Sequence, residues 1–325
     1  MAELTMVEAI NLALRQEMRR DERVVLLGED VGVDGGIFRA TKDLIEKFGE
    51  SRVMDTPLAE SGILGFSIGM AMRGMIPVPE MQFSGFAYLG FHQLESHAAR
   101  MRWRTQGGLH VPMTVRMPYG AGVRALEHHS ESREVFYAHI PGLKIVVPSG
   151  PRNARSLLLA AIRDPDPVVF FEPKASYRAF REEVPDDEEV ADIGKAVTVR
   201  KGADITIVAY GAMLPRAIEA ADALAEDDIG AEVIDLISLS PLDWPAVSAS
   251  VRKTGRCVVV HEAPLSYGPG GEIAARVMED AFLSLEAPVG RVAGPDVHVP
   301  YFAREARYLP DCARILGVCK SVLEY

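Results

Sequence analysis

Short apolar runs alternate with longer periodic segments along the first part of the chain. The runs of strand length occupy residues 23–28, 113–117, 144–147 and 167–171. Apolar runs bounded by Gly, Pro or acidic residues are typical of strands that are buried on both faces of a parallel sheet. Residues 60–73 and 154–162 instead carry the period of helices. This alternation predicts an α/β layered sheet.

An acidic stretch at residues 181–189 interrupts the pattern, contains Pro185 and has no hydrophobic period. A solvated linker explains it more simply than an acidic docking site does. Beyond it the alternation resumes, with strands expected at 204–210, 231–236 and 256–261 and helices at 214–225 and 271–282. Because 325 residues exceed one comfortable hydrophobic core, we expect domains at 1–185 and 200–325, joined by a linker at 186–199.

Composition and charge narrow the class of protein. Hydrophobic residues make up 48% of the chain and the net charge is -11, which argues against a nucleic-acid partner because such a protein needs a basic face. The three cysteines form no CxxC pair, which fits a reducing compartment. Residues 1–20 predict an amphipathic helix with several acids, unlike a signal or transit peptide. With no long apolar run for a membrane span, we expect a soluble, cytoplasmic protein.

Glycines gather in two places without forming a phosphate-binding motif. Residues 268–271 precede a predicted helix, but neither GxGxxG nor GxxxxGK[ST] is present, so a tight turn is favoured. Gly62, Gly65 and Gly69 lie three and four residues apart in the helix at 60–73, where each costs about 1 kcal/mol relative to Ala. Close approach of a neighbouring element would offset that cost. We therefore expect this helix to be buried, with a subunit interface as one candidate place.

Glu60 is the first candidate for chemistry. Thr56 as N-cap and Pro57 at the first helical position predict a helix whose first turn contains Glu60. Acids are common in first turns because the helix dipole favours them, and most have no further role. The apolar residues that follow offer no basic partner, however, so burial would favour the protonated acid, which is the form suited to relaying a proton. Local sequence leaves both interpretations open.

Two other polar segments are candidates for a site. Residues 79–86 combine amide, hydroxyl and aromatic side chains beside a predicted strand; aromatic residues there are most often core, but one could stack on a flat heterocycle. His128 and His129 follow a glycine-rich loop at 119–122 and lack metal-site spacing such as HExxH. A surface pair is the simplest interpretation. A histidine in such a loop also suits general acid–base chemistry near neutral pH.

Nine short motifs occur in order along the chain. They are LGEDV at 27–31, DTPLAE at 55–60, EMQF at 80–83, HHSES at 128–132, PGLK at 141–144, AIRD at 161–164, FEPK at 171–174, AYG at 209–211 and HEAP at 261–264. With all nine, the chain closely resembles the E1 β subunits of the pyruvate and branched-chain 2-oxo acid dehydrogenase complexes, from Thr5 to Tyr325. The resemblance implies an α/β fold, with a parallel-sheet thiamine-diphosphate pyrimidine-binding domain followed by a smaller transketolase C-terminal-type domain.

The resemblance also implies residue roles. Glu60 would hydrogen-bond the aminopyrimidine ring of thiamine diphosphate, and His129, rather than His128, would transfer protons during decarboxylation or reductive acylation. The residues implied along the cofactor are Glu29, Leu58, Ala59, Glu60, Gln82 and Phe86. Those implied in the substrate pocket are Phe83, Ser84, Gly85, Phe86 and His129. A structural potassium ion is implied at Met113, Ala161, Ile162, Asp164 and Asp166, although Pro165 departs from some family patterns.

A missing motif predicts a partner chain. Thiamine enzymes anchor Mg²⁺ and diphosphate through a Gly-Asp-Gly motif followed by an Asn, and the nearest approach here is Asp34-Gly35-Gly36. The resemblance therefore implies an E1 α subunit that holds Mg²⁺, an α₂β₂ heterotetramer, and transfer of the acyl group from pyruvate or a branched-chain 2-oxo acid to a lipoyl-bearing E2 core. The alternatives are an acetoin dehydrogenase β subunit, another transketolase-like half chain, or a non-catalytic scaffold, against which the retention of Glu60 and His129 argues.

Overall fold

The computed structural model describes residues 1–187 and 189–325; residue 188, in the expected linker, lies outside the described part. Contacts divide the chain into two units. The first comprises Met1–Tyr119, Phe136–Ile193 and Leu239–Pro241, and the second comprises Gly120–Val135, Gly194–Ser238 and Leu242–Tyr325. The expected domain boundaries stay a prediction. The hydrophobic pattern did not indicate that residues 120–135 belong to the second unit. No helix of the described residues is long and apolar enough to cross a membrane.

A seven-stranded sheet forms the centre of the first unit, in the order β12-β6-β7-β5-β4-β2-β3. Its strands are β2 (Val24–Gly28), β3 (Val53–Asp55), β4 (Ile76–Glu80), β5 (Thr114–Tyr119), β6 (Lys144–Val146), β7 (Val168–Pro173) and β12 (Ser238–Ser240). The pairings from β6 through to β3 are parallel. Strands β2, β4, β5 and β7 are buried along their whole length, as expected of largely apolar strands in a parallel sheet.

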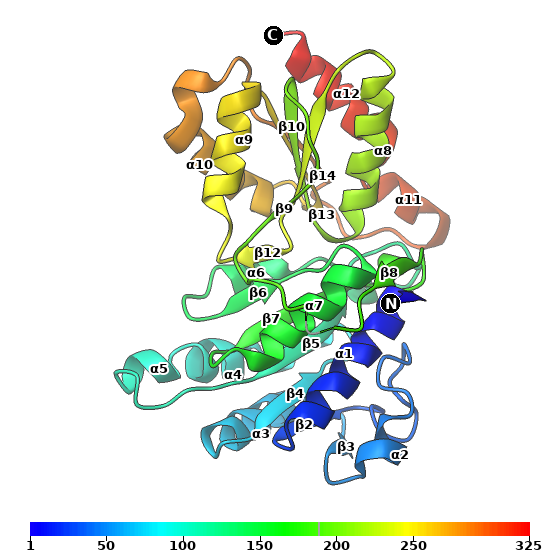
Figure 1. Cartoon of the computed structure of the whole chain (residues 1–325), viewed down its shortest axis with the longest axis vertical. Coiled ribbons are helices and arrows are strands. Elements are labelled where there is room, and N and C mark those ends of the chain that lie inside the picture. The colour runs from blue at the N-terminus through cyan, green and yellow to red at the C-terminus, as the bar shows by residue number, and fades with distance from the viewer. Residues whose placement is uncertain (188) are drawn as a thin grey trace. The chain divides into compact units, whose positions relative to one another are not determined.

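Two long helices, α1 (Met6–Arg20) and α7 (Pro151–Arg163), pack side by side in this unit (Figure 1). Its shorter helical segments are α2 (Leu44–Phe48), η1 (Phe86–Gly90), α4 (Phe91–Gln93), η2 (Leu94–Ala98), α5 (Met101–Arg104), α6 (Glu134–Ala138) and η4 (Lys174–Ser176). The expectation of a helix from residue 1 is wrong for the first residues. Thr5 caps α1, with its backbone N–H donating to Glu8 at 2.8 Å, and Ala2–Leu4 form strand β1.

Strand β1 pairs antiparallel with β8 (Glu182–Val184), which lies within the acidic stretch that lacks a hydrophobic period. Backbone hydrogen bonds form the ladder of this two-stranded sheet, and the strands are too short and too polar for a side-chain pattern to predict them.

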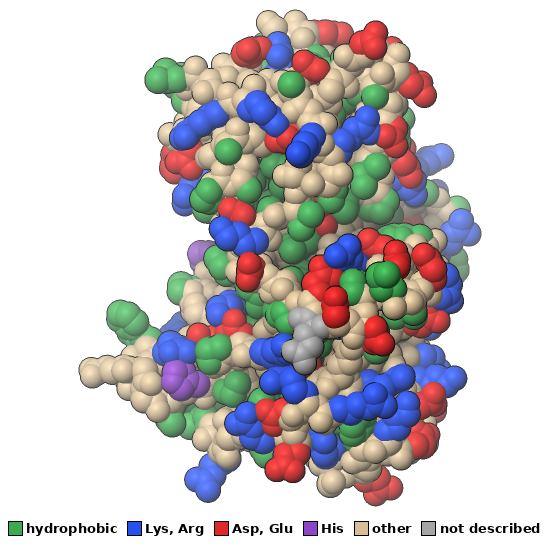
Figure 2. Space-filling view, in the orientation of Figure 1, with side chains coloured by type: hydrophobic (Ala, Val, Ile, Leu, Met, Phe, Trp, Pro, Cys, Tyr) green, Lys and Arg blue, Asp and Glu red, His purple; other side chains and the backbone are tan. Residues whose placement is uncertain are grey.

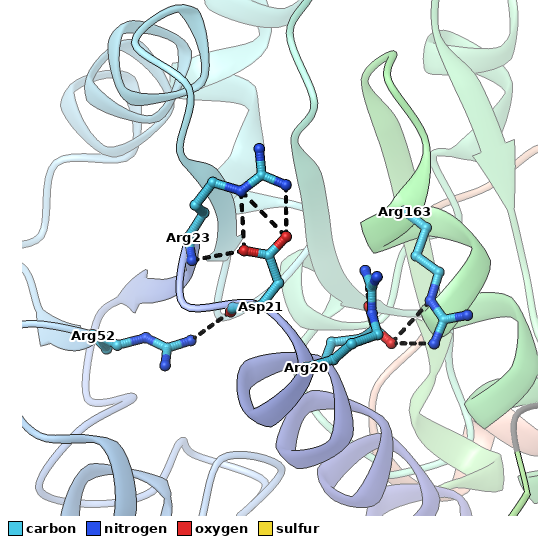
Figure 3. Close-up of polar contacts among 6 residues, drawn as sticks. Arg20, Asp21, Arg23, Arg52 and Arg163 are labelled. Atoms are coloured by element: carbon cyan, nitrogen blue, oxygen red, sulfur yellow. Dashed lines mark hydrogen bonds and ion pairs between the residues drawn. The ribbon is translucent and has the colours of Figure 1, made fainter.

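The end of α1 is fixed by charged groups (Figure 3). The buried carboxylate of Glu17 accepts hydrogen bonds from Arg163 at 2.6 and 3.0 Å, which ties α1 to α7. Asp21 follows the helix; its carboxylate accepts from Arg23 at 2.7 Å and its carbonyl accepts from Arg52 at 3.0 Å. The hydrogen bond from Arg23 lowers the pKa of Asp21 to about 2. These contacts fix the turn that carries the chain from α1 into β2.

Helix α3 (Glu60–Met72) differs from its prediction in two ways. It begins at Glu60 after Ala59, not at Pro57, because the backbone N–H of Thr56 donates to Gly28 at 3.0 Å and keeps the preceding segment on the strand end. It is also only half buried. Gly62 and Gly69 are exposed, and a Cβ at Gly69 would meet nothing within 4 Å. Close packing inside this chain therefore does not explain these glycines.

The second unit contains a five-stranded sheet in the order β14-β13-β10-β11-β9. Its strands are β9 (Val197–Arg200), β10 (Ile205–Ala209), β11 (Ala231–Asp235), β13 (Cys257–Pro264) and β14 (Gly290–Gly294), of which β9 is antiparallel to β11 and the other pairings are parallel. Its helical segments are η3 (Glu127–His129), η5 (Gly211–Met213), α8 (Leu214–Ala225), α9 (Trp244–Thr254), α10 (Pro269–Ala281), η6 (Phe282–Ser284), η7 (Phe302–Arg304), α11 (Glu305–Tyr308) and α12 (Cys312–Leu323). Figure 1 shows α8 and α12 on one side of the sheet and α9 and α10 on the other.

His261, on β13, explains the glycine-rich turn before α10. The imidazole is fully buried, and its Nδ1 lies 3.1 Å from the carbonyl oxygen of Ala263. A Cβ at Gly268 would lie 2.5 Å from its Cε1, and one at Gly270 would lie 2.8 Å from its Nε2. Only glycine fits so close to the ring. Gly271 donates back to Gly268 at 3.0 Å, which makes this the tight turn that the sequence predicts.

Burial lowers the pKa of His261 to about 4. Its ordinary value is higher, so the unfolded chain binds the proton first as the pH falls and the folded state loses stability in that window. We expect the wild-type chain to lose about 2 kcal/mol more free energy of unfolding than His261→Gln between about pH 7.5 and about pH 5. Urea unfolding at both pH values measures this. Equal losses in the two proteins would show that His261 is not buried in its neutral form.

Candidate functional site

The candidate site lies at the carboxyl ends of the central strands of the first unit. Strand β2 has β3 on one side and β4 on the other, so the strand order reverses about β2. In open α/β sheets, ligands bind in the crevice outside such a reversal, at the carboxyl ends of the strands. Glu29 directly follows β2, residues 56–60 follow β3, and Met81–Phe86 follow β4. The fold therefore brings the predicted cofactor residues of this unit to one end of the sheet.

Glu60 is the first residue of α3 and is only 4% exposed. Its Oε2 is buried and has no hydrogen-bond partner among the described residues. Segment η1 packs tightly over this end of α3, because a Cβ at Gly90 would lie 3.0 Å from the Glu60 carbonyl oxygen and 2.4 Å from Leu64. A buried carboxyl oxygen without a partner costs free energy. It is available to bond a polar group that the described residues do not supply.

Glu29 lies close enough to Glu60 to interact with it electrostatically. Burial raises the pKa of Glu29, and the charges of Glu60 and Asp30 raise it further. The neighbouring Asp30 accepts a hydrogen bond from the side chain of Gln82 at 2.7 Å. Asp55 accepts from the backbone of Gly32 at 2.6 Å, which folds the loop after β2 back on the end of β3. Three segments that are distant in sequence thus meet around two acids.

The remaining predicted residues of the first unit surround this centre with different degrees of exposure. Leu58 is 77% exposed and Ala59 is also exposed. Phe86 is half buried, and its ring packs edge-on against Phe83 with centroids 5.5 Å apart. Ser84 and Gly85 are buried. Leu58 and Ala59 thus leave apolar surface exposed close in sequence to the buried Glu60.

A buried ion-pair network that the sequence did not predict supports this loop. Arg116 on β5 is 1% exposed and donates to Glu172 on β7 at 2.7 and 3.1 Å and to Glu80 on β4 at 2.5 Å. Tyr177 also donates to Glu172. The charges of Glu172 and Glu80 raise the pKa of Arg116 even though burial alone would lower it. The backbone N–H of Met81 donates to the Arg116 carbonyl at 2.9 Å. The network therefore lies directly before residues 81–86, which contain the predicted cofactor and substrate residues.

Charged residues inside otherwise apolar strand runs were the signal for this network. Glu80, Arg116 and Glu172 each stand in or next to such a run. Sequence alone could not show that they face one another, because strand order decides which strands are neighbours.

The two adjacent histidines lie in the second unit and differ in exposure. His128 is exposed, with Nδ1 3.9 Å from a carboxylate oxygen of Glu131, whereas His129 is half buried. Both belong to η3, and the backbone of His129 donates to the carbonyl of Leu126 at 3.0 Å. The two side chains therefore have different surroundings. The choice of His129 over His128 as the active residue stays a prediction.

The residues expected around potassium lie at the end of α7 and the start of β5. The Met113 carbonyl accepts from Val168 at 2.9 Å, and the Ala161 carbonyl accepts from Asp164 at 3.3 Å. Lys144 pairs with Asp164 at 2.6 Å. Asp166 pairs with Arg102, and no group of three or more His, Cys, Asp or Glu side chains in the described chain is arranged to hold a metal. Ile162 is buried in the core. The potassium site stays a prediction.

A groove of about 770 Å³ lies elsewhere in the first unit and contains none of the predicted site residues. Its cationic lining residues are Arg15, Arg39, Lys42, Arg178 and Arg181. Figure 2 shows Lys and Arg side chains gathered around the N-terminal helix. The groove also contains Glu8, Asp43 and Asp186, so its charge is partly compensated and we assign it no role in the site.

Comparison with known proteins connects this geometry to a family. Residues 2–181 match the pyrimidine-binding domain of transketolase and residues 194–315 match its C-terminal domain. The pyruvate dehydrogenase E1 component subunit β of Bacillus subtilis (strain 168) is 48% identical over 325 residues, covering 100% of both chains. That of Acholeplasma laidlawii is 49% identical over 322 residues, covering 99% of this chain and 98% of the relative.

A solved structure described as a split gene transketolase, inactive β4 tetramer, superposes with a TM-score of 0.81 at 23% identity and covers 99% of each chain. At that identity the likeness concerns the fold. Together with the domain matches, it confirms the predicted fold class of two transketolase-type α/β domains.

The network around Arg116 gives a prediction about stability. Arg116→Met would leave Glu80 and Glu172 buried without their cation, and removing one partner of a buried ion pair costs about 3–5 kcal/mol. Arg152→Met is the matched control, because Arg152 pairs with Glu189 at 2.9 Å on the surface of the same unit. Chemical unfolding of the isolated chain compares the three proteins. Equal effects of the two substitutions would contradict the central place of the Arg116 network.

Proposed function

Because the chain belongs to the family of pyruvate dehydrogenase E1 β subunits, built from transketolase-type domains, we propose that it is the β subunit of a thiamine-diphosphate-dependent 2-oxo acid dehydrogenase. The complete enzyme decarboxylates pyruvate and transfers the acetyl group to a lipoyl-bearing E2 protein. The names of relatives at 48% and 49% identity favour pyruvate over a branched-chain 2-oxo acid. A cytoplasmic location fits this role.

The observation that carries the proposal is the buried, unpartnered Oε2 of Glu60 among the described residues. The aminopyrimidine ring of thiamine diphosphate has ring and amino nitrogens that can bond this oxygen. When bound, thiamine diphosphate would supply an acidic thiazolium C–H that becomes a carbon nucleophile once its proton is removed. Glu60 holds and moves the proton at the aminopyrimidine nitrogen. Glu29, which is buried and interacts electrostatically with Glu60, lies at the same end of the site.

The other predicted residues have roles that follow from their side chains. Phe86 offers a half-buried ring on which a flat pyrimidine can stack, and Leu58 and Ala59 present apolar surface to the cofactor. Gln82 orients Asp30 at the edge of the pocket. The substrate lies against Phe83, Ser84 and Gly85. His129 transfers the proton in decarboxylation or reductive acylation, because an imidazole can both accept and donate a proton.

A partner subunit completes the site. The chain lacks the Gly-Asp-Gly motif, and in its nearest counterpart the backbone N–H groups of Gly35 and Gly36 are already bonded to the carbonyls of Gly32 and Asp30. The diphosphate and its Mg²⁺ are therefore held by an E1 α subunit, in an α₂β₂ heterotetramer. The exposed face of α3 fits a helix of a neighbouring subunit: Gly62 and Gly69 allow close approach, and Phe66 is 60% exposed.

A substitution of Glu60 tests its proposed catalytic role. In the reconstituted α₂β₂ enzyme, Glu60→Gln should lower kcat about 100- to 10,000-fold, the range of general acid–base catalysis, while the thermal midpoint and assembly remain unchanged. Glu50→Gln, at an exposed acid of the same unit, is the control. Acyl transfer is assayed with pyruvate and 2-oxoisovalerate side by side. Near-normal turnover of Glu60→Gln would return Glu60 to a capping role and favour a scaffold, and activity with acetoin alone would favour an acetoin dehydrogenase.

A substitution of Gly69 tests the proposed subunit contact at the exposed face of α3. Gly69→Leu should fold at least as well as wild type, because a Cβ at Gly69 meets no neighbour and Leu favours a helix by nearly 1 kcal/mol over Gly. It should nevertheless fail to form the heterotetramer. Calorimetry with thiamine diphosphate and Mg²⁺ should give tight binding for the wild-type chain plus the α subunit, and weak binding for the wild-type chain alone and for the variant plus α. Strong binding by the isolated chain would refute the shared site.

A further inference from the structure

Two buried glutamates hold the base of the loop that carries His129. The loop starts at Gly120, whose backbone N–H donates to the carbonyl of Glu131 at 3.1 Å and so closes residues 120–131 into a ring. Within the ring, Ser130 and His129 both donate to the backbone around Leu126 and Glu127, which gives the histidine segment a fixed local shape. The position of the histidine therefore depends on what anchors the closed end.

Glu262 supplies the first anchor. It stands on β13 within the HEAP motif and is 3% exposed. Its Oε2 accepts a hydrogen bond from the backbone of Ala121 at 3.0 Å. Gly120 has a φ of +82°, and a Cβ there would lie 2.5 Å from the other oxygen of Glu262. Only a residue without a side chain leaves room for Glu262 at position 120. This contact gives Glu262 of the HEAP motif a structural role that the local sequence did not indicate.

Glu305 supplies the second anchor from a different element. It is the first residue of α11 and is 2% exposed, and its Oε1 accepts a hydrogen bond from the backbone of Gly122. Ala121, between the two bonded residues, packs against Val299 and Tyr308 in a small apolar cluster. Hydrogen bonds from backbone N–H groups to ionised acceptors are shorter and roughly twice as strong as neutral ones.

We propose that Glu262 and Glu305 are positioning residues for His129, fixing its loop to β13 and α11 through the backbone of residues 121 and 122. This inference rests on the role proposed above for His129 and adds the residues that set its place. In the contacts described here, both glutamates accept hydrogen bonds from backbone groups of the loop. They act on catalysis through the loop, and displacement of a catalytic group by about 1 Å can cost on the order of 100-fold in rate.

The experiment uses the reconstituted α₂β₂ enzyme with Glu262→Gln, Glu262→Ala, Glu305→Gln and Glu305→Ala. The Ala variants should lower kcat for acyl transfer about 10- to 100-fold, and the Gln variants, which retain an acceptor oxygen, should restore part of it. Binding of thiamine diphosphate should stay within about twofold, because the residues proposed for it belong to the first unit. Glu226→Gln, at an exposed acid of the second unit, should match wild type.

A double-variant cycle separates positioning from general stability. If the glutamates act through His129, adding Glu305→Ala to a His129→Ala enzyme should lower kcat no further, whereas independent losses would multiply. Multiplying losses, or a fall in kcat that only follows loss of folded protein, would overturn the proposal. Hydrogen exchange is a second measurement: exchange in residues 120–131 should rise in the Ala variants and not in Glu226→Gln. Unchanged exchange there would refute the anchoring.

These outcomes are distinct from failure of the proposed function. If the wild-type enzyme transfers no acyl group from any 2-oxo acid, the proposed function fails, yet hydrogen exchange still tests whether the glutamates hold the loop. If the wild-type enzyme is active and the Ala variants keep full kcat, the anchoring role in catalysis fails while the proposed function stands.

Discussion

The buried charge of Arg116 is the constraint on which the first unit depends. An arginine that is 1% exposed has lost almost all of its hydration, and its ion pairs with Glu80 and Glu172 on the two neighbouring strands offset that loss. The three charges cross β4, β5 and β7, so these strands cannot shift separately without exposing an unpaired charge to a low-dielectric interior. Residues 81–86, which contain the predicted cofactor and substrate residues after β4, start directly after Glu80. The ion pairs of Glu80 therefore also fix where this segment begins.

The candidate site next to this network is incomplete among the described residues. Glu60 is buried with an oxygen that no described residue bonds, while Leu58 next to it is 77% exposed. A carboxyl group in this situation costs stability unless a further molecule bonds it, and exposed apolar side chains gain when they are covered. A cofactor and a partner helix together would remove both costs. The same reasoning suggests a role for the exposed Gly62 and Gly69 of α3, which no close contact among the described residues explains.

Much of the fold could be predicted from hydrophobic period, and the exceptions have physical causes. The runs at 23–28, 113–117 and 167–171 are strands because a parallel sheet buries both faces. The start of α3 at Glu60 could not be predicted, because a backbone hydrogen bond from Thr56 to Gly28 outweighs the local preference of Thr and Pro for a helix start. The pairing of β1 with β8 could not be predicted either, because these short polar strands carry no hydrophobic period.

The sequence by itself determined the succession of strands and helices, the two-unit α/β plan and the family, because these depend on side-chain period and on motifs that are each local in the chain. It also singled out Glu60 and the histidine pair as candidates. Only the tertiary structure decided that Glu29 lies beside Glu60, that Arg116 pairs across three strands, and that Glu262 and Glu305 hold the loop of His129. Those contacts join residues from 31 to 183 positions apart, and strand order and packing, rather than any local pattern, bring such residues together.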